Sequence, residues 1–314
     1  MTETITVKTA MVFPGQGSQA VGMLADLGAD YDVVGDTFSQ ASEVLGYDLW
    51  QLIQDGPAEE LNQTDRTQPA MLASGVAVWR AWRALGGEVP LVMAGHSLGE
   101  YTALVCAGAL TFEDAVELVA ERGRCMQSAV PAGVGGMAAI LGLDDEAVAA
   151  VCRQAAGDEV VTPVNYNSPG QVVIAGHVTA VVRAIGLAKE AGAKRAVELP
   201  VSVPSHCALM EPAAARFADK LQQLALSSPD IPVIQNVDAV SHQEPELIRT
   251  NLSRQLYSPV QWVRSIQAMG AAGVTRVFEL GPGKVLTGLG KRIDKTIDYS
   301  AVYDAQTLKA ALAG

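Results

Sequence analysis

The sequence predicts an α/β fold in two parts, a large domain built on a mainly parallel sheet and a smaller ferredoxin-like domain inserted into it. Three short apolar runs each pass into a glycine-rich turn, at residues 9–14, 91–96 and 274–283. Strands that alternate with helices and end in such turns form parallel sheets whose sites lie at the carboxyl ends of the strands. A different pattern between residues 137 and 200 predicts the inserted domain.

The three apolar runs are typical of buried strands. TAMVFP leads into the turn GQGSQ, and LVMAGH is followed by SLGEYTALVCAGAL, which has helical spacing. The third run, VTRVFELGPG, again ends in glycines. We therefore expect all three strands in the sheet of the large domain.

The middle of the chain has the element order β-α-β-β-α-β, which is the ferredoxin-like pattern. Its expected strands are MAAILGL, EVVTPVNYN, QVVIAG and KRAVELP, with the turn SPG between the second and the third. One helix is opened by Asp144 and Asp145, and the other spans residues 178–191. We therefore expect residues 1–130 and 201–314 to form the large domain and residues 131–200 to form the inserted subdomain.

Length and composition indicate a globular protein that folds by itself. The 314 residues are 49% apolar and 18% charged. The net charge of −12, from 34 acidic and 22 basic residues, argues against nucleic acid or an anionic membrane as the main partner. Any acidic partner must therefore bind a local basic patch.

The first residues, the length of the apolar runs and the cysteines predict the cellular compartment. The start MTETITVKTAMVF lacks the basic segment and cleavage site of a signal peptide, and no stretch reaches about 18 unbroken apolar residues. The four cysteines are scattered without CxxC spacing, which predicts reduced thiols and neither a disulfide framework nor a zinc site. We therefore expect a soluble, cytoplasmic protein without a bound metal. We also expect a monomer.

The motif GHSLG, residues 95–99, lies where a nucleophile elbow must lie, between a strand and a helix. In such a turn the central residue, Ser97, projects from the top of the sheet, as it does in α/β-hydrolase-like domains. The N-terminus of the following helix offers free N–H groups to an oxyanion. We therefore predict that Ser97 is a nucleophile rather than an ordinary helix cap.

A serine nucleophile needs a base, and the sequence contains only four histidines. His206 follows the apolar run VELPVSVPS and precedes a helix, so we expect it at a strand end and predict that it is the base. His96 should diverge from Ser97 in an elbow and is interpreted as a packing residue, whereas His177 and His242 are interpreted as surface residues. No acidic residue has the context of a third triad member, so a backbone carbonyl or an amide side chain could equally orient the imidazole.

Two glycine motifs allow a competing interpretation. GQGSQA after a strand fits the dinucleotide fingerprint G-x-G-x-x-A, which predicts a nucleotide-binding enzyme. That fingerprint also requires an acidic residue at the end of a second strand, and Asp36, at the right distance, lies in DTFSQASEVL, which has helical spacing. The same glycines suit an oxyanion loop, which we favour. GPGK lacks the spacing of a phosphate loop and is interpreted as a turn.

Seven motifs, three of which contain the glycine motifs above, are spread over the whole chain: FPGQGSQ, GHSLGEY, RGRCMQ, NYNSPGQVVIAG, PVSVPSHC, QLYSPVQW and GPGKVLTG. Together they resemble those of bacterial malonyl-CoA:acyl carrier protein transacylases and, more distantly, the acyltransferase domains of fatty-acid and polyketide synthases. The agreement is far more specific than a lone GxSxG motif.

The resemblance implies roles for six residues. They are Ser97 as the acylated nucleophile, His206 as its base, Gln16 and Leu98 as the N–H donors of the oxyanion hole, Arg122 as the ligand of the malonyl carboxylate, and Gln255 as a lining residue that orients the imidazole. Arginine suits its role because its rigid fork of donors matches a carboxylate. By sequence context alone, however, Arg122 lies in the charged stretch AERGR, which is typical of a solvated helix face.

The resemblance also implies a reaction. The malonyl group of malonyl-CoA would pass to the phosphopantetheine thiol of acyl carrier protein by a ping-pong mechanism through a malonyl-Ser97 ester, without a cofactor. The pathway would be fatty-acid synthesis, with polyketide synthesis left open. An acyl-CoA hydrolase that uses the same Ser-His pair and a non-enzymatic docking subunit are the alternatives.

The carrier protein requires a docking surface of suitable charge. Carrier proteins of this type are acidic, as is this chain, so we expect docking on a local basic patch. The candidates are Lys189, Lys194, Arg195, Lys284, Lys291 and Arg292. Solvated helix faces are the alternative interpretation of these residues.

Overall fold

The computed structural model describes residues 7–201 and 203–313 of the chain. Its larger sheet, sheet A, has five strands in the order β7-β2-β1-β8-β9. Every pairing in sheet A is parallel. The strands are β1 (Thr9–Phe13), β2 (Val92–Gly95), β7 (Val233–Ile234), β8 (Arg276–Leu280) and β9 (Asp298–Val302). The three predicted strands therefore lie together as β1, β2 and β8.

Helices cover both faces of sheet A because its strands are apolar on both faces. Met11 and Phe13 of β1 pack into one core with ten helices, whereas Ala10 and Val12 pack into a second core with α12 and α13. The helices of the first face are α1 (Ala25–Asp30), α2 (Asp32–Leu45), α3 (Leu49–Asp55), α4 (Ala58–Leu61), α5 (Thr64–Ala84), α6 (Gly99–Cys106), α7 (Phe112–Gln127), α10 (Glu211–Gln222), α11 (Pro245–Gln255) and α14 (Ala305–Leu312). Those of the second face are α12 (Trp262–Ala271) and α13 (Val285–Ile293).

The second sheet, sheet B, lies between residues 135 and 198 and has the strand order β4-β5-β3-β6 with antiparallel pairings. The elements are β3 (Gly135–Leu141), α8 (Asp145–Ala156), β4 (Val161–Ser168), β5 (Gln171–His177), α9 (Val178–Glu190) and β6 (Arg195–Glu198). This confirms the predicted order β-α-β-β-α-β. Asp144 caps α8 as expected, since its carboxylate accepts a hydrogen bond from the Ala147 N–H at 2.7 Å.

The two faces of sheet B differ in what they contact. Ile140, Val172 and Ile174 pack against α8 and α9, whereas Val173 and Ala175 on the other face pack with Cys207. Cys207 follows the predicted base His206 in the chain. Sheet B therefore abuts the segment that carries this histidine.

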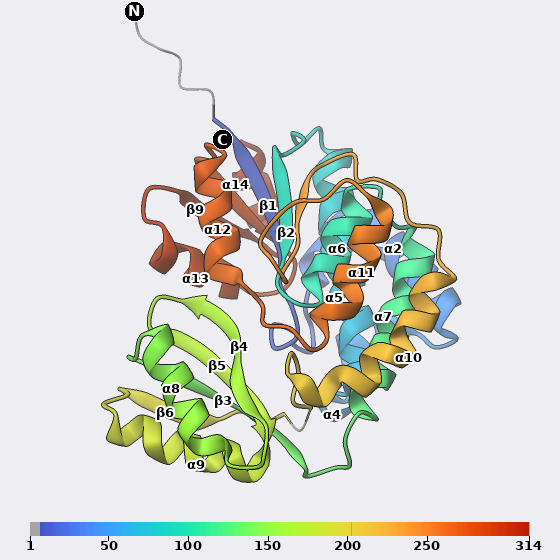
Figure 1. Cartoon of the computed structure of the whole chain (residues 1–314). Helices are drawn as coiled ribbons and strands as arrows, with labels where there is room; N and C mark the ends of the chain where they lie inside the picture. The colour runs from blue at the N-terminus through green and yellow to red at the C-terminus, as the bar shows by residue number, and fades with distance from the viewer. Residues whose placement is uncertain (1–6, 202, 314) are drawn as a thin grey trace, which may run out of the picture.

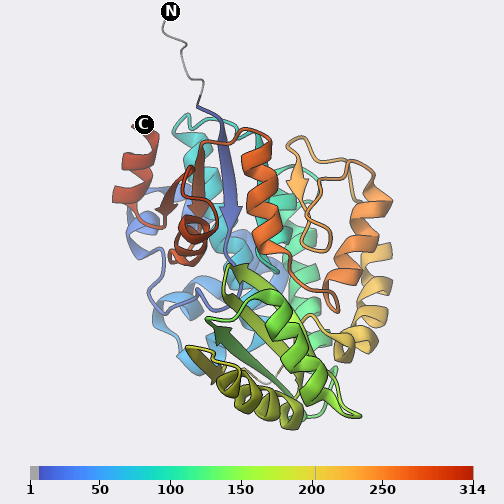
Figure 2. The ribbon, with the colours of Figure 1, turned by 60° about the vertical axis from the view of Figure 1, so that its left-hand side comes forward.

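Sheet B and its two helices lie at one end of the molecule, below the carboxyl ends of the parallel strands in both views (Figures 1 and 2). The turns after β1 and β2 therefore face the smaller sheet, which places the candidate site where the two sheets approach each other. Within the described residues, no helix is both long enough and apolar enough to cross a membrane.

One predicted helix is shorter than expected. The helical spacing of SLGEYTALVCAGAL suggested a helix that continues to the end of this motif, but α6 ends at Cys106 and α7 starts at Phe112. Gly108 has φ +76°, a left-handed conformation that stops the helix and is typical of glycine after a helix end. The break starts a new helix, α7, which carries Arg122.

Candidate active site

Ser97 lies in the turn between β2 and α6, as the elbow motif predicts. Its φ is +50°, a conformation that side-chain-bearing residues rarely adopt and that is held only where the surroundings enforce it. The turn is packed closely: a Cβ on Gly99 would lie 2.0 Å from the Phe13 carbonyl oxygen of β1. Glycine is therefore required beside this strand, and Ser97 is half-buried at the strand end.

His206 is aimed at Ser97, but it lies in a turn beyond the end of β6 at Glu198 and not at a strand end, so the expected position is wrong. Its Nε2 lies 2.9 Å from Ser97 Oγ, and its Nδ1 lies 2.7 Å from the backbone oxygen of Gln255. Because a carbonyl oxygen only accepts hydrogen bonds, Nδ1 carries the hydrogen and Nε2 is free to accept the serine proton. The sequence left two possible orienting groups open, and the structure selects the backbone carbonyl. Burial, and then the positive charge of Arg122, lower the pKa of His206 to about 3, so the imidazole is neutral at physiological pH.

Arg122 is buried rather than solvated, so the interpretation from its charged sequence context is wrong. Only 1% of the residue is exposed. The neighbouring Glu121 and Arg124 form an ion pair at 2.7 Å on the outer side of α7, whereas Arg122 faces inward. A charged stretch does not reveal which of its members turns inward, because that depends on what the helix packs against.

The Arg122 guanidinium is surrounded by polar groups. It donates hydrogen bonds of 2.9 Å to the side-chain oxygens of Gln68 and Gln255, and one of 3.1 Å to Ser97 Oγ. Its Nε is buried and has no hydrogen-bond partner among the described residues. None of its hydrogen-bond partners is an acid, although the buried carboxylate of Glu100 is close enough to act on its charge, so the guanidinium directly beside the serine hydroxyl has no carboxylate bound to it.

Of the two predicted oxyanion donors, Leu98 lies in the turn that carries Ser97 and Gln16 lies in a loop that approaches this turn. Leu98 is the N-cap of α6, where an N–H has no partner inside the helix. Gln16 lies in the loop after β1, and this loop approaches the elbow so closely that a Cβ on Gly15 would lie 2.5 Å from the His96 carbonyl oxygen. Neither N–H has a protein acceptor among the described residues.

The dinucleotide interpretation of the same loop is not supported. The fingerprint requires a helix to start within the glycine motif, but the first helix, α1, begins at Ala25. Asp36 lies inside α2 rather than at a strand end. GPGK forms a bend before α13, as interpreted from the sequence.

The remaining histidines have fixed partners. His96 packs on Trp262, with ring centroids 5.5 Å apart, and its Nε2 lies 2.8 Å from Asn167 Oδ1 of β4. This confirms a packing role and joins the elbow to sheet B. The surface interpretation of the other two needs correction: His177 Nδ1 accepts the Val160 N–H at 2.9 Å, and His242 lies 2.8 Å from Asp238 with 17% of its side chain exposed.

Several site residues were not found from the sequence. Gln68 binds Arg122, and Asn236 accepts the Ser97 N–H at 2.7 Å. Glu100 lies below the elbow and binds Gln255 at 2.9 Å. Glu100 and Asn167 are part of motifs that carry the family resemblance, so a signal existed for them. Gln68 and Asn236 lie outside those motifs.

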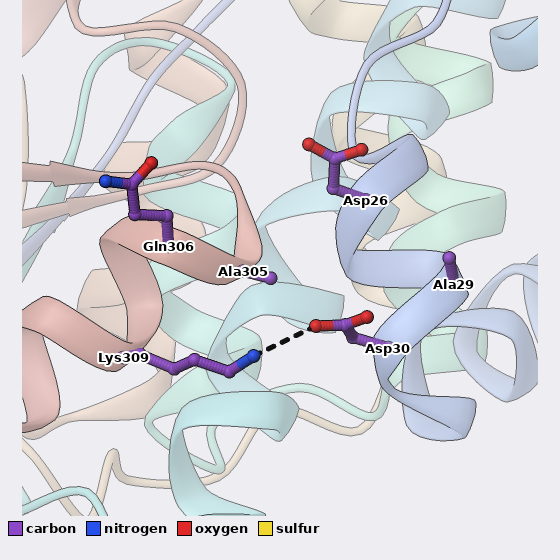
Figure 3. Close-up of a pocket in the computed structure, with 6 residues that line it drawn as sticks. All are labelled: Asp26, Ala29, Asp30, Ala305, Gln306 and Lys309. Carbon is purple, nitrogen blue, oxygen red and sulfur yellow. Dashed lines mark hydrogen bonds and ion pairs between the residues drawn. The ribbon is translucent and has the colours of Figure 1, made fainter.

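A surface depression of about 470 Å³ lies elsewhere, between α1 and α14 (Figure 3). It contains none of the candidate site residues, and its single lysine, Lys309, binds Asp30 at 3.1 Å. The depression therefore has no connection to the Ser97 chemistry.

Comparison with known proteins decides the family. A family model of the acyl transferase domain matches residues 10–304. The chain belongs to the acyl transferase family. It is similar to the malonyl CoA-acyl carrier protein transacylases of Salmonella typhimurium, at 58% identity over 96% of this chain and 98% of that protein, and of Bacillus subtilis, at 46% identity over 97% and 96%.

Solved structures of this acyl transferase family agree with the fold. An acyl carrier protein S-malonyltransferase from Vibrio cholerae superposes with a TM-score of 0.95 at 63% identity, covering 96% of this chain and 99% of that one. A malonyl-transacylase in complex with its type II PKS acyl-carrier protein superposes with a TM-score of 0.97 at 55% identity, covering 98% and 99%. These names favour the transferase interpretation over the hydrolase one.

Proposed function

We propose that this acyl transferase moves the malonyl group of malonyl-CoA to the phosphopantetheine thiol of acyl carrier protein, for fatty-acid synthesis. One observation carries the substrate assignment: the buried guanidinium of Arg122 lies 3.1 Å from Ser97 Oγ and lacks an acidic hydrogen-bond partner. An acyl group held on Ser97 and ending in a carboxylate would supply that partner. Water is largely excluded there, so the pairing is stronger than at a surface.

In the first half-reaction Ser97 is acylated. His206 Nε2 takes the hydroxyl proton as Oγ attacks the thioester carbon, and the resulting oxyanion is bound by the N–H groups of Gln16 and Leu98. The carbon–sulfur bond then breaks, and the imidazolium returns its proton to the sulfur of coenzyme A. The product is malonyl-Ser97.

In the second half-reaction the steps run in reverse with another thiol. The phosphopantetheine thiol gives its proton to His206 and attacks the ester carbonyl, and the Ser97 oxygen leaves and regains the proton. Gln255 supports both halves because its backbone oxygen orients His206 while its side chain binds Arg122.

The substrate carboxylate also affects the base. Burial and, second, the charge of Arg122 depress the pKa of His206. Pairing of the malonyl carboxylate with Arg122 compensates that charge, so the imidazole becomes a stronger base when the correct acyl group is bound. An acetyl group leaves the charge uncompensated. Recognition and proton transfer are coupled in this way.

The proposal extends to the architecture and the state of the enzyme. Residues 1–130 and 201–314 form the α/β-hydrolase-like domain, with the nucleophile after β2, and residues 131–200 form the ferredoxin-like subdomain. The enzyme acts as a monomer in the cytoplasm, and its four free cysteines are in keeping with that compartment.

The carrier protein docks on basic residues between the two parts of the chain. All six candidates, Lys189, Lys194, Arg195, Lys284, Lys291 and Arg292, are exposed. Lys194 and Arg292 line one depression of about 640 Å³, although they come from the turn before β6 and from α13. Arg292 also binds Gln171 of β5 at 2.8 Å. An acidic carrier would meet positive charge from both parts at once.

Intact-mass measurement tests the function. Incubation with malonyl-CoA should add one malonyl mass to the wild type, on the peptide that contains Ser97, and none to Ser97→Ala. Addition of acyl carrier protein should remove the label and produce malonylated carrier. A label that persists in Ser97→Ala contradicts the covalent mechanism. A label that water removes as fast as the carrier does shows a hydrolase instead.

A further inference from the structure

Glu100 is a fully buried carboxylate three residues after the nucleophile in the chain. It lies in the first turn of α6 and is 0% exposed. Oε1 accepts a hydrogen bond of 3.1 Å from the Gln235 side chain, and Oε2 accepts bonds of 2.8 Å from the Asn236 N–H and 2.9 Å from Gln255 Nε2. The other ionisable groups that act on it are the guanidinium of Arg122 and the phenol of Tyr101. Three donors thus converge on a group that the reaction itself does not use.

Glu100 determines which way the amide of Gln255 points. An ionised carboxylate only accepts hydrogen bonds, so it requires the Nε2 end of the amide. The Oε1 end is then left for Arg122, which it meets at 2.9 Å. In the opposite orientation the Nε2 donors would face the Arg122 guanidinium, which also only donates, and Oε1 would face the carboxylate of Glu100, which only accepts. Gln255 Nε2 also lies 3.1 Å from the Ser97 backbone oxygen, which ties the same amide to the elbow.

Glu100 also anchors a second amide that holds the elbow. Its bond to the Asn236 N–H fixes this residue just after β7. The Asn236 side chain then accepts the Ser97 N–H and donates to the Gly95 carbonyl, both at 2.7 Å. These two bonds bracket the left-handed backbone at Ser97. The carboxylate therefore supports the nucleophile from one side and the arginine from the other.

We infer that Glu100, in its ionised form, is a positioning residue for acyl transfer: it orients Gln255 toward Arg122 and Asn236 toward the Ser97 backbone. This inference rests on the proposed function, since it concerns the rate of Ser97 acylation. Protonation would turn one oxygen into a donor and remove an acceptor from the three converging groups. The acylation rate should therefore depend on the charge of a residue that never touches the substrate.

Burial raises the pKa of Glu100 to about 7, against the hydrogen bonds that lower it. Acylation should then weaken as the pH falls through about 7. The pKa of His206 is about 3 in the free protein but rises when a malonyl carboxylate pairs with Arg122, so loss of this limb in Glu100→Gln is what assigns it to Glu100. The contribution of Glu100 to the free energy of unfolding changes with pH in the opposite direction. A raised pKa means that the folded protein holds the proton more tightly than the unfolded chain, so this contribution is present below the usual carboxyl pKa of 4.5 and is lost as the pH rises through about 7. A purely structural role would not separate activity from stability in this way.

The test is the single-turnover rate of malonyl-Ser97 formation between pH 5.5 and 8.5. Saturating malonyl-pantetheine is the donor, because it lacks the phosphates of coenzyme A that titrate in this range. The wild type should show an inflection near pH 7. Glu100→Gln should lose the inflection and acylate about ten- to a hundredfold more slowly at pH 8, the loss expected for hydrogen bonds to a charged group.

Two further variants give the controls. Glu279→Gln alters another carboxylate that is 0% exposed, held by the N–H groups of Leu286 and Thr287 and by none of the groups that bind Glu100, and should retain the inflection. Adding Gln235→Glu to Glu100→Gln exchanges donor and acceptor across their hydrogen bond and should recover part of the rate. A wild-type profile without an inflection between pH 6 and 8 overturns the inference even if no variant folds. A Glu100→Gln protein that keeps the inflection also overturns the inference. Labelling of wild-type Ser97 in the same experiment shows that the proposed function holds in either case.

Discussion

Removal of Arg122 should separate recognition of the malonyl group from the chemistry on Ser97. In Arg122→Ala a malonyl carboxylate loses a buried fork that would donate two charge-assisted hydrogen bonds, each worth about 1.5–3 kcal/mol. The combined loss of about 3–6 kcal/mol corresponds to a fall of about 10²- to 10⁴-fold in kcat/KM for malonyl-CoA. The fork is 1% exposed, so little solvent screening reduces this loss.

Acetyl-CoA is the matched substrate because it lacks the carboxylate. Its kcat/KM should fall less than about tenfold, or rise. A rise has a physical cause: burial and then the charge of Arg122 lower the pKa of His206, and the substitution removes the second of these. Steady-state transfer to acyl carrier protein with each thioester measures the ratio, and thermal unfolding of each variant shows whether the fold is intact.

Two further substitutions at this position control for volume and charge. Arg122→Met fills most of the space without a charge and should behave like Arg122→Ala. Arg122→Lys keeps the charge but lacks the planar fork that reaches Gln68 and Gln255, so malonyl transfer should still be clearly impaired. Equal losses for malonyl and acetyl transfer in both Arg122→Ala and Arg122→Met would refute the reasoning, because Arg122 would then only support the surrounding structure.

Three other predictions follow from the geometry. His206→Ala should acylate about 10²- to 10⁴-fold more slowly than the wild type by intact mass, and a near-normal rate would exclude His206 as the base. Because the pKa of His206 falls from the usual 6.5 to about 3, its contribution to stability is present above pH 6.5 and is lost as the pH falls toward 3. Between pH 7 and pH 5 the free energy of unfolding, measured with urea, should fall less in His206→Gln than in the wild type. An equal fall in both proteins would contradict this. Lys194→Glu combined with Lys291→Glu should raise the KM for carrier protein and weaken its salt dependence, with acylation by malonyl-CoA unchanged. Lys309→Glu, on α14 (Figure 3), reverses one exposed lysine charge at another place and should leave that KM unchanged; an unaltered KM in the double variant would rule out the basic surface.

Much of the fold could be predicted from local patterns. Apolar runs that end in glycine-rich turns identified β1, β2 and β8, and alternating elements identified the order of sheet B, because strand and helix periods are properties of consecutive residues. The sequence did not predict the strand order of sheet A, in which β7 and β9 are the edge strands. Pairing between strands far apart in the chain leaves no local signal.

The site divides in the same way. Ser97 could be recognised because an elbow needs a strand, a helix and flanking glycines within a few consecutive residues. His206 could be identified as the base by eliminating the other three of the four histidines. By contrast, the group that orients His206 is a backbone carbonyl, which every residue possesses, so no sequence pattern could identify Gln255 by chemistry alone.

Only the tertiary structure decided the electrostatics. Arg122 looked solvated in its charged helix, and its burial depends on the packing of α7 against α5 and on Gln68. Glu100 acquires its role from Gln235, Asn236 and Gln255, which lie at least 135 positions away in the chain. Desolvation and the direction of hydrogen bonds depend on what surrounds a group in space. The sequence by itself therefore determined where the nucleophile is, and the folded structure determined which charges surround it.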